Sequence, residues 1–96
     1  MAKGYVMGNI SITDPEAYKE YARQVPGVVA QYGGTYLVRG GAMETREGAP
    51  LMERVVVIAF ESLAAAKRFY ESPEYAPVLK IRLAAARSQL AIVEGI

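Results

Sequence analysis

Hydrophobic and polar residues alternate from Tyr5 to Ile12, which is the pattern of a strand with one buried face. The spacing of apolar residues then becomes helical, because they recur every three or four positions and form one stripe. The residues of this stripe are Ala17, Tyr21, Val25, Val28 and Tyr32. The first two predicted elements are therefore a strand and an amphipathic helix.

The helix carries ordinary start and stop signals. The run Thr13 to Glu16 predicts its start, with Asp14 as N-cap, Pro15 at the first helical position and the two ends of the run as a capping box. Gly33-Gly34 ends the helix, because glycine adopts the left-handed conformation without a Cβ clash. Inside the helix, Pro26-Gly27 is expected to produce a kink or a break.

Two further strands are predicted in the middle of the chain, from Thr35 to Gly41 and from Met52 to Phe60. A polar loop, Ala42 to Leu51, joins them. Val55 to Phe60 is apolar at every position, so both faces of that strand should be buried. This pattern predicts a central position in the sheet.

The remaining residues predict helices and a last strand. Ser62 caps a second helix, whose apolar residues again form a stripe. Ser72-Pro73 ends this helix and starts a third helical segment, Glu74 to Arg87. The last strand is Gln89 to Glu94.

The elements follow the order βαββαβ, with the last helix in two parts. This order predicts one α+β domain over residues 1–96, in which a four-stranded antiparallel sheet carries its long helices on one face. The other face would then be bare, although the third strand is apolar on both sides. We therefore expect a homodimer in which the helix-free faces of two sheets pack together.

Composition narrows the classes of function. The 96 residues include no cysteine and no histidine, which excludes thiol and imidazole chemistry, and we expect neither a metal nor a cofactor. A net charge of +1 lacks the strong positive field of a nucleic-acid-binding protein. No apolar run reaches the roughly 18 residues of a membrane span, and no signal-peptide core is present. We expect a cytoplasmic protein without nucleic-acid or membrane partners.

Arg39 is the first candidate for chemistry, because it places a guanidinium in a strand-like run between two glycine pairs. By strand alternation its side chain points the same way as those of Thr35 and Leu37. On an enclosed face the charge needs a partner, since an unpaired buried charge costs several kcal/mol. Either a carboxylate of this chain, Glu44 or Glu53, or a bound anion meets that need, and the sequence leaves both open.

The helix break at Ser72-Pro73 is the second candidate, because side chains from both flanking segments can converge there. Tyr70 and Tyr75 bring two phenols that can donate hydrogen bonds, and Ser72 brings a hydroxyl. Core packing with a capping serine explains the same residues and stays open as an alternative.

Basic residues near the end of the last helix are a further feature. Arg82 and Arg87, with Lys80, are most simply interpreted as its solvated face. Arg82 has the alternative of turning inward toward Tyr75.

Several of these residues occur in an order that resembles a known family. The pattern begins with Tyr18-x-x-Tyr21 and Gly33-Gly34 and continues through Tyr36 to Gly41. Its later members are Glu44, Arg54, Phe60, Phe69-Tyr70-x-Ser72-Pro73-x-Tyr75 and Arg82. Over nearly its whole length the chain is similar to the domain-of-unknown-function family 1330.

The resemblance implies a ferredoxin-like fold of the dimeric α/β-barrel superfamily, with a cleft between sheet and helices in each protomer. At the matching positions it implies a cleft set made of Arg39, Arg54, Tyr70, Ser72, Tyr75 and Arg82, with Asn9 beside them on the first strand. Superfamily relatives include cofactor-free monooxygenases, isomerases, haem-degrading enzymes and stress-responsive proteins, and fold alone transfers none of these functions. A haem site normally uses histidine, which is absent.

Two functions of different classes remain open, and the sequence does not decide whether the chain is an enzyme. In the first, it binds or transforms a small anionic or enolisable organic molecule, as a cofactor-free monooxygenase or an isomerase would. Arg39 then polarises an oxygen, and Tyr70 or Tyr75 supplies a proton. The ligand-binding residues would be Asn9, Arg54, Ser72 and Arg82. In the second, the chain is a structural, interaction or stress-related homodimer whose polar groups only satisfy one another.

Overall fold

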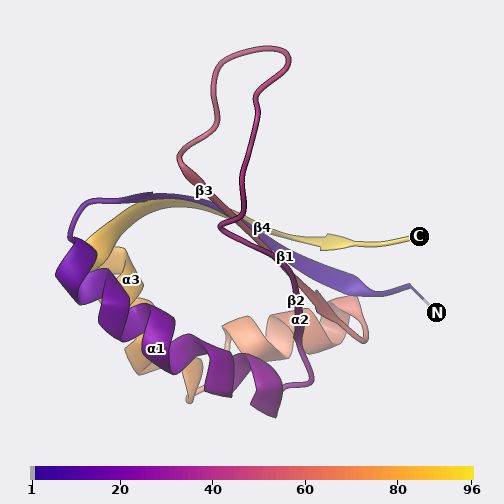
Figure 1. Cartoon of the computed structure of the whole chain (residues 1–96). Coiled ribbons are helices and arrows are strands. Elements are labelled where there is room, and N and C mark those ends of the chain that lie inside the picture. Colours follow the sequence, from indigo (N-terminus) through magenta and orange to yellow (C-terminus); the bar gives the residue numbers. More distant parts are fainter. Residues whose placement is uncertain (1) are drawn as a thin grey trace.

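The computed structural model describes residues 2–96 and contains a four-stranded sheet backed by helices (Figure 1). Along the chain the elements are β1 (Gly4–Ile12), α1 (Pro15–Gln31), β2 (Thr35–Arg39), β3 (Arg54–Phe60), α2 (Leu63–Tyr70), α3 (Tyr75–Ala85) and β4 (Ala86–Glu94). Neighbouring strands are antiparallel, in the order β2-β3-β1-β4. The predicted α+β, ferredoxin-like fold is confirmed, and so is the central position of β3.

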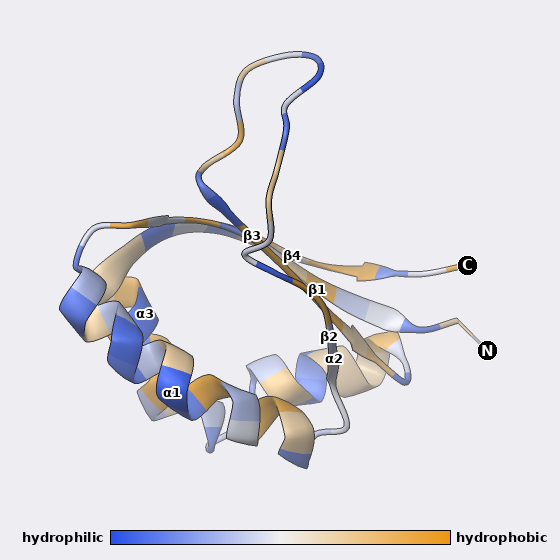
Figure 2. Ribbon diagram, viewed as in Figure 1, coloured by the Kyte–Doolittle hydropathy of each residue, from blue (hydrophilic) through white to orange (hydrophobic). Residues whose placement is uncertain are grey.

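The helices lie on one side of the sheet, as predicted (Figure 1). Figure 2 shows the consequence for the sequence: hydrophobic residues run along the strands, while α1 alternates between hydrophobic and hydrophilic residues. A helix on the surface needs only one apolar stripe, whereas a strand in the middle of the sheet is covered on at least one whole face.

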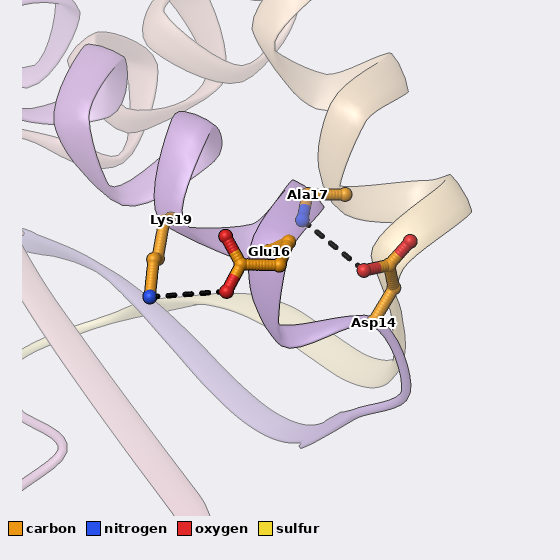
Figure 3. Close-up of polar contacts among 4 residues, drawn as sticks. All are labelled: Asp14, Glu16, Ala17 and Lys19. Atoms are coloured by element: carbon orange, nitrogen blue, oxygen red, sulfur yellow. Dashed lines mark hydrogen bonds and ion pairs between the residues drawn. The ribbon is translucent and has the colours of Figure 1, made fainter.

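Helix α1 begins and ends where its sequence signals predict. The Asp14 carboxylate accepts a hydrogen bond from the Ala17 N–H at 3.2 Å, which confirms it as N-cap (Figure 3). Glu16 pairs with Lys19 at 3.2 Å, in an exposed ion pair, rather than closing the predicted capping box (Figure 3). At the other end Gly33 has a φ of 76°, the left-handed conformation that stops a helix.

Pro26 does not break α1, because the helix continues through it to Gln31, and the prediction of a break at Pro26-Gly27 is wrong. Proline has no N–H to donate to the carbonyl four residues earlier, which here belongs to Ala22. The Ala22 carbonyl accepts instead from Arg39 Nη2, at 3.2 Å. A hydrogen bond from β2 thus replaces the one that the helix lacks.

A β-bulge in β2 decides where Arg39 points. Tyr36 is opposite Ile58 and Arg39 is opposite Val56, with a shift of register just after Tyr36. Val56 and Ile58 lie on the helix side of the sheet, so Tyr36 and Arg39 lie there too. Simple alternation put Arg39 on the same face as Leu37. That prediction is wrong, because the bulge adds one residue to β2 and reverses the alternation after it.

The loop of residues 40–53 leaves the sheet at Gly40, whose φ of 67° is left-handed. β2 therefore ends at Arg39 rather than at Gly41, and β3 begins at Arg54, two residues later than predicted. The loop projects from the side of the sheet opposite the helices (Figure 1).

β4 follows α3 without a loop and begins at Ala86, three residues earlier than predicted. Arg87 therefore lies on a strand and not on the solvated face of the last helix, which corrects the sequence interpretation. The carbonyl of Ala85, the last residue of α3, accepts from the backbone N–H groups of Thr13 and Asp14 at 2.8 and 2.9 Å. These bonds fix the end of α3 against the turn between β1 and α1.

Stacked aromatic rings form the core near α2. The Phe69 ring centroid lies 5.1 Å from that of Phe60 and 4.6 Å from that of Tyr75. Each of the three residues is 1% exposed. Because they come from β3, α2 and α3, this packing fixes α3 against the sheet and positions Tyr75.

The helix-free face of the sheet keeps exposed apolar side chains. Met7, Leu37, Val38 and Val93 are 47, 58, 40 and 43% exposed. Met7 pairs in register with Val57 on the neighbouring strand, so both point away from the helices. We refer to these five residues as the open-face patch.

Candidate functional site

A cavity lies between the sheet and the helices α1 and α3. It is narrow: a group the size of water has about 30 Å³ to move in, inside about 500 Å³ of total space that includes the open mouth. The sheet supplies most of the apolar lining, which includes Val6, Ile10, Val56, Ile58 and Leu90. The polar lining consists of four tyrosines and three arginines, namely Tyr18, Tyr21, Tyr36, Tyr75, Arg39, Arg54 and Arg82.

Arg82, on α3, brings a buried guanidinium to the cavity and is 2% exposed. Its Cζ lies 5.9 Å from the centre of the Tyr21 ring, and the hydroxyls of Tyr21 and Tyr75 are 2.8 Å apart. Its Nε is buried and has no hydrogen-bond partner among residues 2–96. The interpretation of Arg82 as a solvated residue is therefore wrong. Its side chain turns inward, which was the alternative.

Burial keeps the phenols beside these arginines neutral. It raises the pKa of Tyr21 far above the ordinary value, and Tyr75 adds to the effect. Burial also raises the pKa of Tyr36, against the opposing charge of Arg39. At neutral pH Tyr21 and Tyr36 are therefore hydrogen-bond donors rather than bases.

The same phenols hold Arg82 in its charged form. Burial by itself lowers the pKa of Arg82, because it disfavours the charged guanidinium. The phenolic oxygens of Tyr75 and Tyr21 outweigh this effect and leave the pKa raised. The cavity thus contains a permanent positive charge at its buried end.

Arg54, the first residue of β3, supplies a second guanidinium. Its Cζ lies 5.7 Å from the centre of the Tyr18 ring, and its buried Nε has no hydrogen-bond partner within residues 2–96. A Cβ atom on Gly40 would collide with this guanidinium. The glycine that follows Arg39 therefore gives Arg54 the space it occupies, besides permitting the left-handed turn.

Arg39 is the exposed member of the three and lies at the mouth. Its Cζ is 4.7 Å from the centre of the Tyr36 ring, and Nη2 donates to the Ala22 carbonyl at 3.2 Å. Neither carboxylate considered from the sequence pairs with it. Glu44 pairs within the loop at 3.1 Å, and Glu53 accepts a backbone N–H of β1 at 2.9 Å.

The three guanidiniums share one arrangement. Each lies over a tyrosine ring, and none forms an ion pair with a carboxylate of residues 2–96. No aspartate or glutamate lines the cavity. An aromatic face attracts a cation without neutralising it. The cavity therefore keeps its positive charges available, and charged fork-shaped donors of this kind recognise carboxylates and similar oxyanions.

Four of the seven predicted cleft residues line this cavity, namely Arg39, Arg54, Tyr75 and Arg82. The other three lie outside the lining and are Asn9, Tyr70 and Ser72. Asn9 secures the end of the long loop: its Nδ2 donates to the Met52 carbonyl at 3.1 Å, and its Oδ1 accepts from the Met52 N–H at 3.0 Å.

Ser72 and Tyr70 support Tyr75 from outside the cavity. The buried Ser72 hydroxyl donates to the Phe69 carbonyl at 2.8 Å and accepts from the Tyr75 N–H at 3.1 Å. The Tyr70 ring centroid lies 5.7 Å from that of Tyr75. Tyr70 and Ser72 therefore have the roles that the sequence left open as an alternative, namely core packing and hydrogen bonding to the backbone. Of the polar residues at the helix break, only Tyr75 lines the cavity.

Sequence reasoning missed three tyrosines of the lining. Tyr18 and Tyr21 lie three residues apart on α1, with ring centroids 5.4 Å apart. The predicted helical stripe includes Tyr21 only as a core residue, and Tyr18 lies outside that stripe. The available signal was the choice of tyrosine, since a buried phenol needs a hydrogen-bond partner and a phenylalanine does not. For Tyr36 the signal was hidden, because its face depends on the bulge that follows it.

The described residues form neither a cluster of metal ligands nor a membrane-spanning helix. Among residues 2–96 no three aspartates, glutamates, histidines or cysteines cluster closely enough to hold a metal ion. No helix in this range is both long and apolar enough to cross a membrane.

Residues 3–96 match the family described as Domain of unknown function (DUF1330). The chain belongs to this family. The resemblance that the sequence carries is therefore confirmed over nearly all of its length. No curated protein sequence matches this DUF1330 chain significantly.

Solved structures show where else the DUF1330 fold occurs. The RPA0582 protein of unknown function from Rhodopseudomonas palustris has a TM-score of 0.77 at 20% identity, covering 99% of this chain and 83% of that one. SnoaB, a cofactor-independent oxygenase from Streptomyces nogalater, has a TM-score of 0.66 at 11% identity, covering 97% and 92%. A conserved protein of unknown function from Bacteroides thetaiotaomicron, a possible oxidoreductase, has a TM-score of 0.63 at 12% identity, covering 97% of both chains. At these identities the likeness shows the fold alone.

Proposed function

We propose that this DUF1330 protein binds a small organic anion, or an enolisable molecule in its ionised form, in the cavity between the sheet and helices α1 and α3. The observation that carries the proposal is the group of three guanidiniums that line the cavity with no carboxylate beside them. A buried charge without a counter-ion is costly, and a bound anion removes that cost.

The lining assigns each group a chemical role. Arg39, at the mouth, polarises an oxygen of the ligand, while Arg54 and Arg82 hold its negative charge. Tyr75 donates a hydrogen bond to the ligand, and its hydroxyl lies 2.8 Å from that of Tyr21, which burial keeps neutral. An enolate held in this way is the common requirement of an isomerase and of a cofactor-free oxygenase.

The lining also lacks a base. It contains no carboxylate and the chain has no histidine, while burial keeps Tyr21 neutral. A ligand must therefore enter already ionised, or be acidic enough for the guanidiniums to ionise it on binding. Carboxylic acids and acidic enols meet this condition at neutral pH. SnoaB, which has a similar fold, is a cofactor-independent oxygenase, so this fold can host a reaction without a cofactor.

The second function, a ligand-free interaction protein, draws on a different observation. The open-face patch exposes apolar side chains that a second copy or another protein would cover. On that account the cavity is empty in the working protein.

Native mass spectrometry of the untagged protein distinguishes the two functions. We expect a non-covalent adduct with an organic acid, either retained through purification or formed on titration with a panel of small acids. The adduct should weaken in Arg39→Met and Arg54→Met. The control is Arg68→Met, which removes an exposed arginine of α2 that does not line the cavity. If no acid of the panel binds, or if Arg39→Met carries the same adducts as the wild type, the proposed function is wrong.

A further inference from the structure

We infer that the ligand carries two negative groups, one at each end of a short apolar body, an inference that rests on the proposed function and specifies its ligand. The evidence is that the three guanidiniums lie at different depths. Arg82 is 2% exposed, whereas Arg39 is exposed at the mouth. A single carboxylate at one depth leaves the charge at the other depth without a partner.

The inner end is built for one oxyanion. Arg82 lines the cavity, and its buried Nε has no partner among residues 2–96. The Tyr21 and Tyr75 hydroxyls, 2.8 Å apart, share one hydrogen bond between them. Since only one of the two is the donor in that bond, the other hydroxyl proton is free for an anion beside Arg82. An oxyanion there would accept a charged N–H and a phenolic O–H.

The outer end is built for a second oxyanion. The Arg54 guanidinium packs against Gly40, which directly follows Arg39 in the chain, so both arginines reach the same end of the cavity. Arg54 Nε is also buried without a partner within residues 2–96. Arg39 donates to a backbone carbonyl and lies over a tyrosine ring, and both contacts leave its charge in place.

The sheet also contributes apolar side chains to the lining, such as Val56 and Ile58, which suit an apolar body between the two charged ends. The centre of a water-sized group has only about 30 Å³ to move in, so the cavity is narrow and we expect the body between the two charges to be short. The chemical class is therefore a short-chain dicarboxylate, or a small carboxylate whose second negative group is an enolate.

Calorimetric titration with four probe acids at constant ionic strength tests this inference. Malonate, succinate and glutarate carry two carboxylates at increasing separation, and butyrate is the monocarboxylate matched in carbon number to succinate. We expect at least one diacid to bind about tenfold or more tightly than butyrate, because it gains a second charge-assisted contact. Succinamide, the neutral diamide of succinate, should bind more weakly than the preferred diacid and more weakly than butyrate.

Variants assign the two ends. Arg82→Met and Arg39→Met should each reduce the preferred diacid to the affinity of butyrate, while Arg68→Met leaves the preference unchanged. Arg82→Met exchanges a buried charge for an apolar side chain of similar length, and circular dichroism checks its fold. The exposed Arg39 provides the same test without a change to the core.

The outcomes separate the inference from the proposed function. If butyrate binds as tightly as every diacid, the two-ended ligand is wrong and anion binding stands. If the diacid preference survives in Arg39→Met and Arg82→Met, the assignment of the ends is wrong. If none of the four acids binds, the proposed function fails together with the inference.

Discussion

At the scale of single residues, the cavity shows how a small protein keeps charges unneutralised inside its fold. Each of the three arginines is oriented by the face of a tyrosine, at 4.7 to 5.9 Å from Cζ to ring centre. A carboxylate in the same place would hold the guanidinium more firmly but would also occupy it. The tyrosines orient the charge and leave it free for a ligand.

Tyr21 makes the stability of the protein sensitive to alkaline pH. Because burial raises its pKa above that of an unfolded tyrosine, about 10, the folded state keeps a proton that the unfolded state releases. The stabilisation is complete below pH ~10 and is lost above it, by roughly 1.4 kcal/mol per pH unit for this one group.

Urea denaturation of Tyr21→Phe at pH 8, 9, 10 and 11 measures this contribution. At pH 8 the variant should be about 1 kcal/mol less stable, because Tyr75 loses its hydroxyl partner. Above pH 10 its free energy of unfolding should fall less steeply than that of the wild type. Equal slopes for the two proteins would show that Tyr21 is not protected from ionisation.

At the scale of elements, local patterns predict the strands and helices, and their partners decide the site. Alternation and helical stripes identify each element, since both depend only on neighbouring residues. The bulge in β2 was hidden because its register depends on pairing with β3. The role of Pro26 was hidden as well. Pro26 leaves the Ala22 carbonyl without its helical partner, and this carbonyl accepts a hydrogen bond from Arg39, 17 residues further along the chain. The pairing of β2 with β3 and the hydrogen bond between Arg39 and Ala22 therefore fix features of the site that local sequence patterns do not contain.

The predicted residues that miss the cavity have a physical explanation as well. Asn9 lies within β1, and Tyr70 and Ser72 lie at the break between α2 and α3. For such polar or amphipathic residues, a hydrogen-bonding role in the fold and a role in ligand binding produce the same sequence signal. The structure shows Asn9 bonded to the loop and the Ser72 hydroxyl accepting from the N–H of Tyr75, the first residue of α3. Only the three-dimensional packing separates these roles.

Pro26→Ala tests the link between α1 and β2. The new N–H can donate to the Ala22 carbonyl, which should raise the free energy of unfolding by roughly 1 kcal/mol, since proline is the poorest helix former. The same bond competes with Arg39 for its acceptor, so binding of the preferred diacid should weaken severalfold. Stability and affinity are thus expected to change in opposite directions.

Pro77→Ala is the matched control for this change. Pro77 lies in the first turn of α3, where a missing N–H breaks no helical hydrogen bond. Thermal melting and calorimetry should find its affinity for the diacid unchanged. An unaltered affinity in Pro26→Ala would mean that the Ala22 carbonyl does not position Arg39.

At the scale of the whole molecule, the helices cover one face of the sheet (Figure 1). The other face has the exposed apolar residues of the open-face patch. A chain of 96 residues buries a smaller share of its surface than a larger domain does, so covering this patch would add substantially to its stability. The sequence predicts that a second copy covers it, and this stays a prediction.

Light scattering at micromolar concentration measures the assembly. We expect about twice the chain mass of 10.4 kDa. Val57→Asp should give a monomer, because it puts a carboxylate in the centre of the patch, whereas Val57→Thr keeps the shape without the charge and should remain dimeric. A wild-type protein that scatters as a folded monomer at this concentration rules out the predicted interface.

The central claim is that the cavity guanidiniums hold an organic anion, and nuclear magnetic resonance of the arginine side chains tests it most directly. The Nε–H groups of Arg54 and Arg82 are buried without partners among residues 2–96, so each should report a new acceptor by a change of chemical shift. We expect both signals, assigned with Arg54→Met and Arg82→Met, to move and saturate on titration with the preferred diacid while the Arg68 signal stays fixed. Signals of Arg54 and Arg82 that do not move at any concentration of the acid would contradict the account.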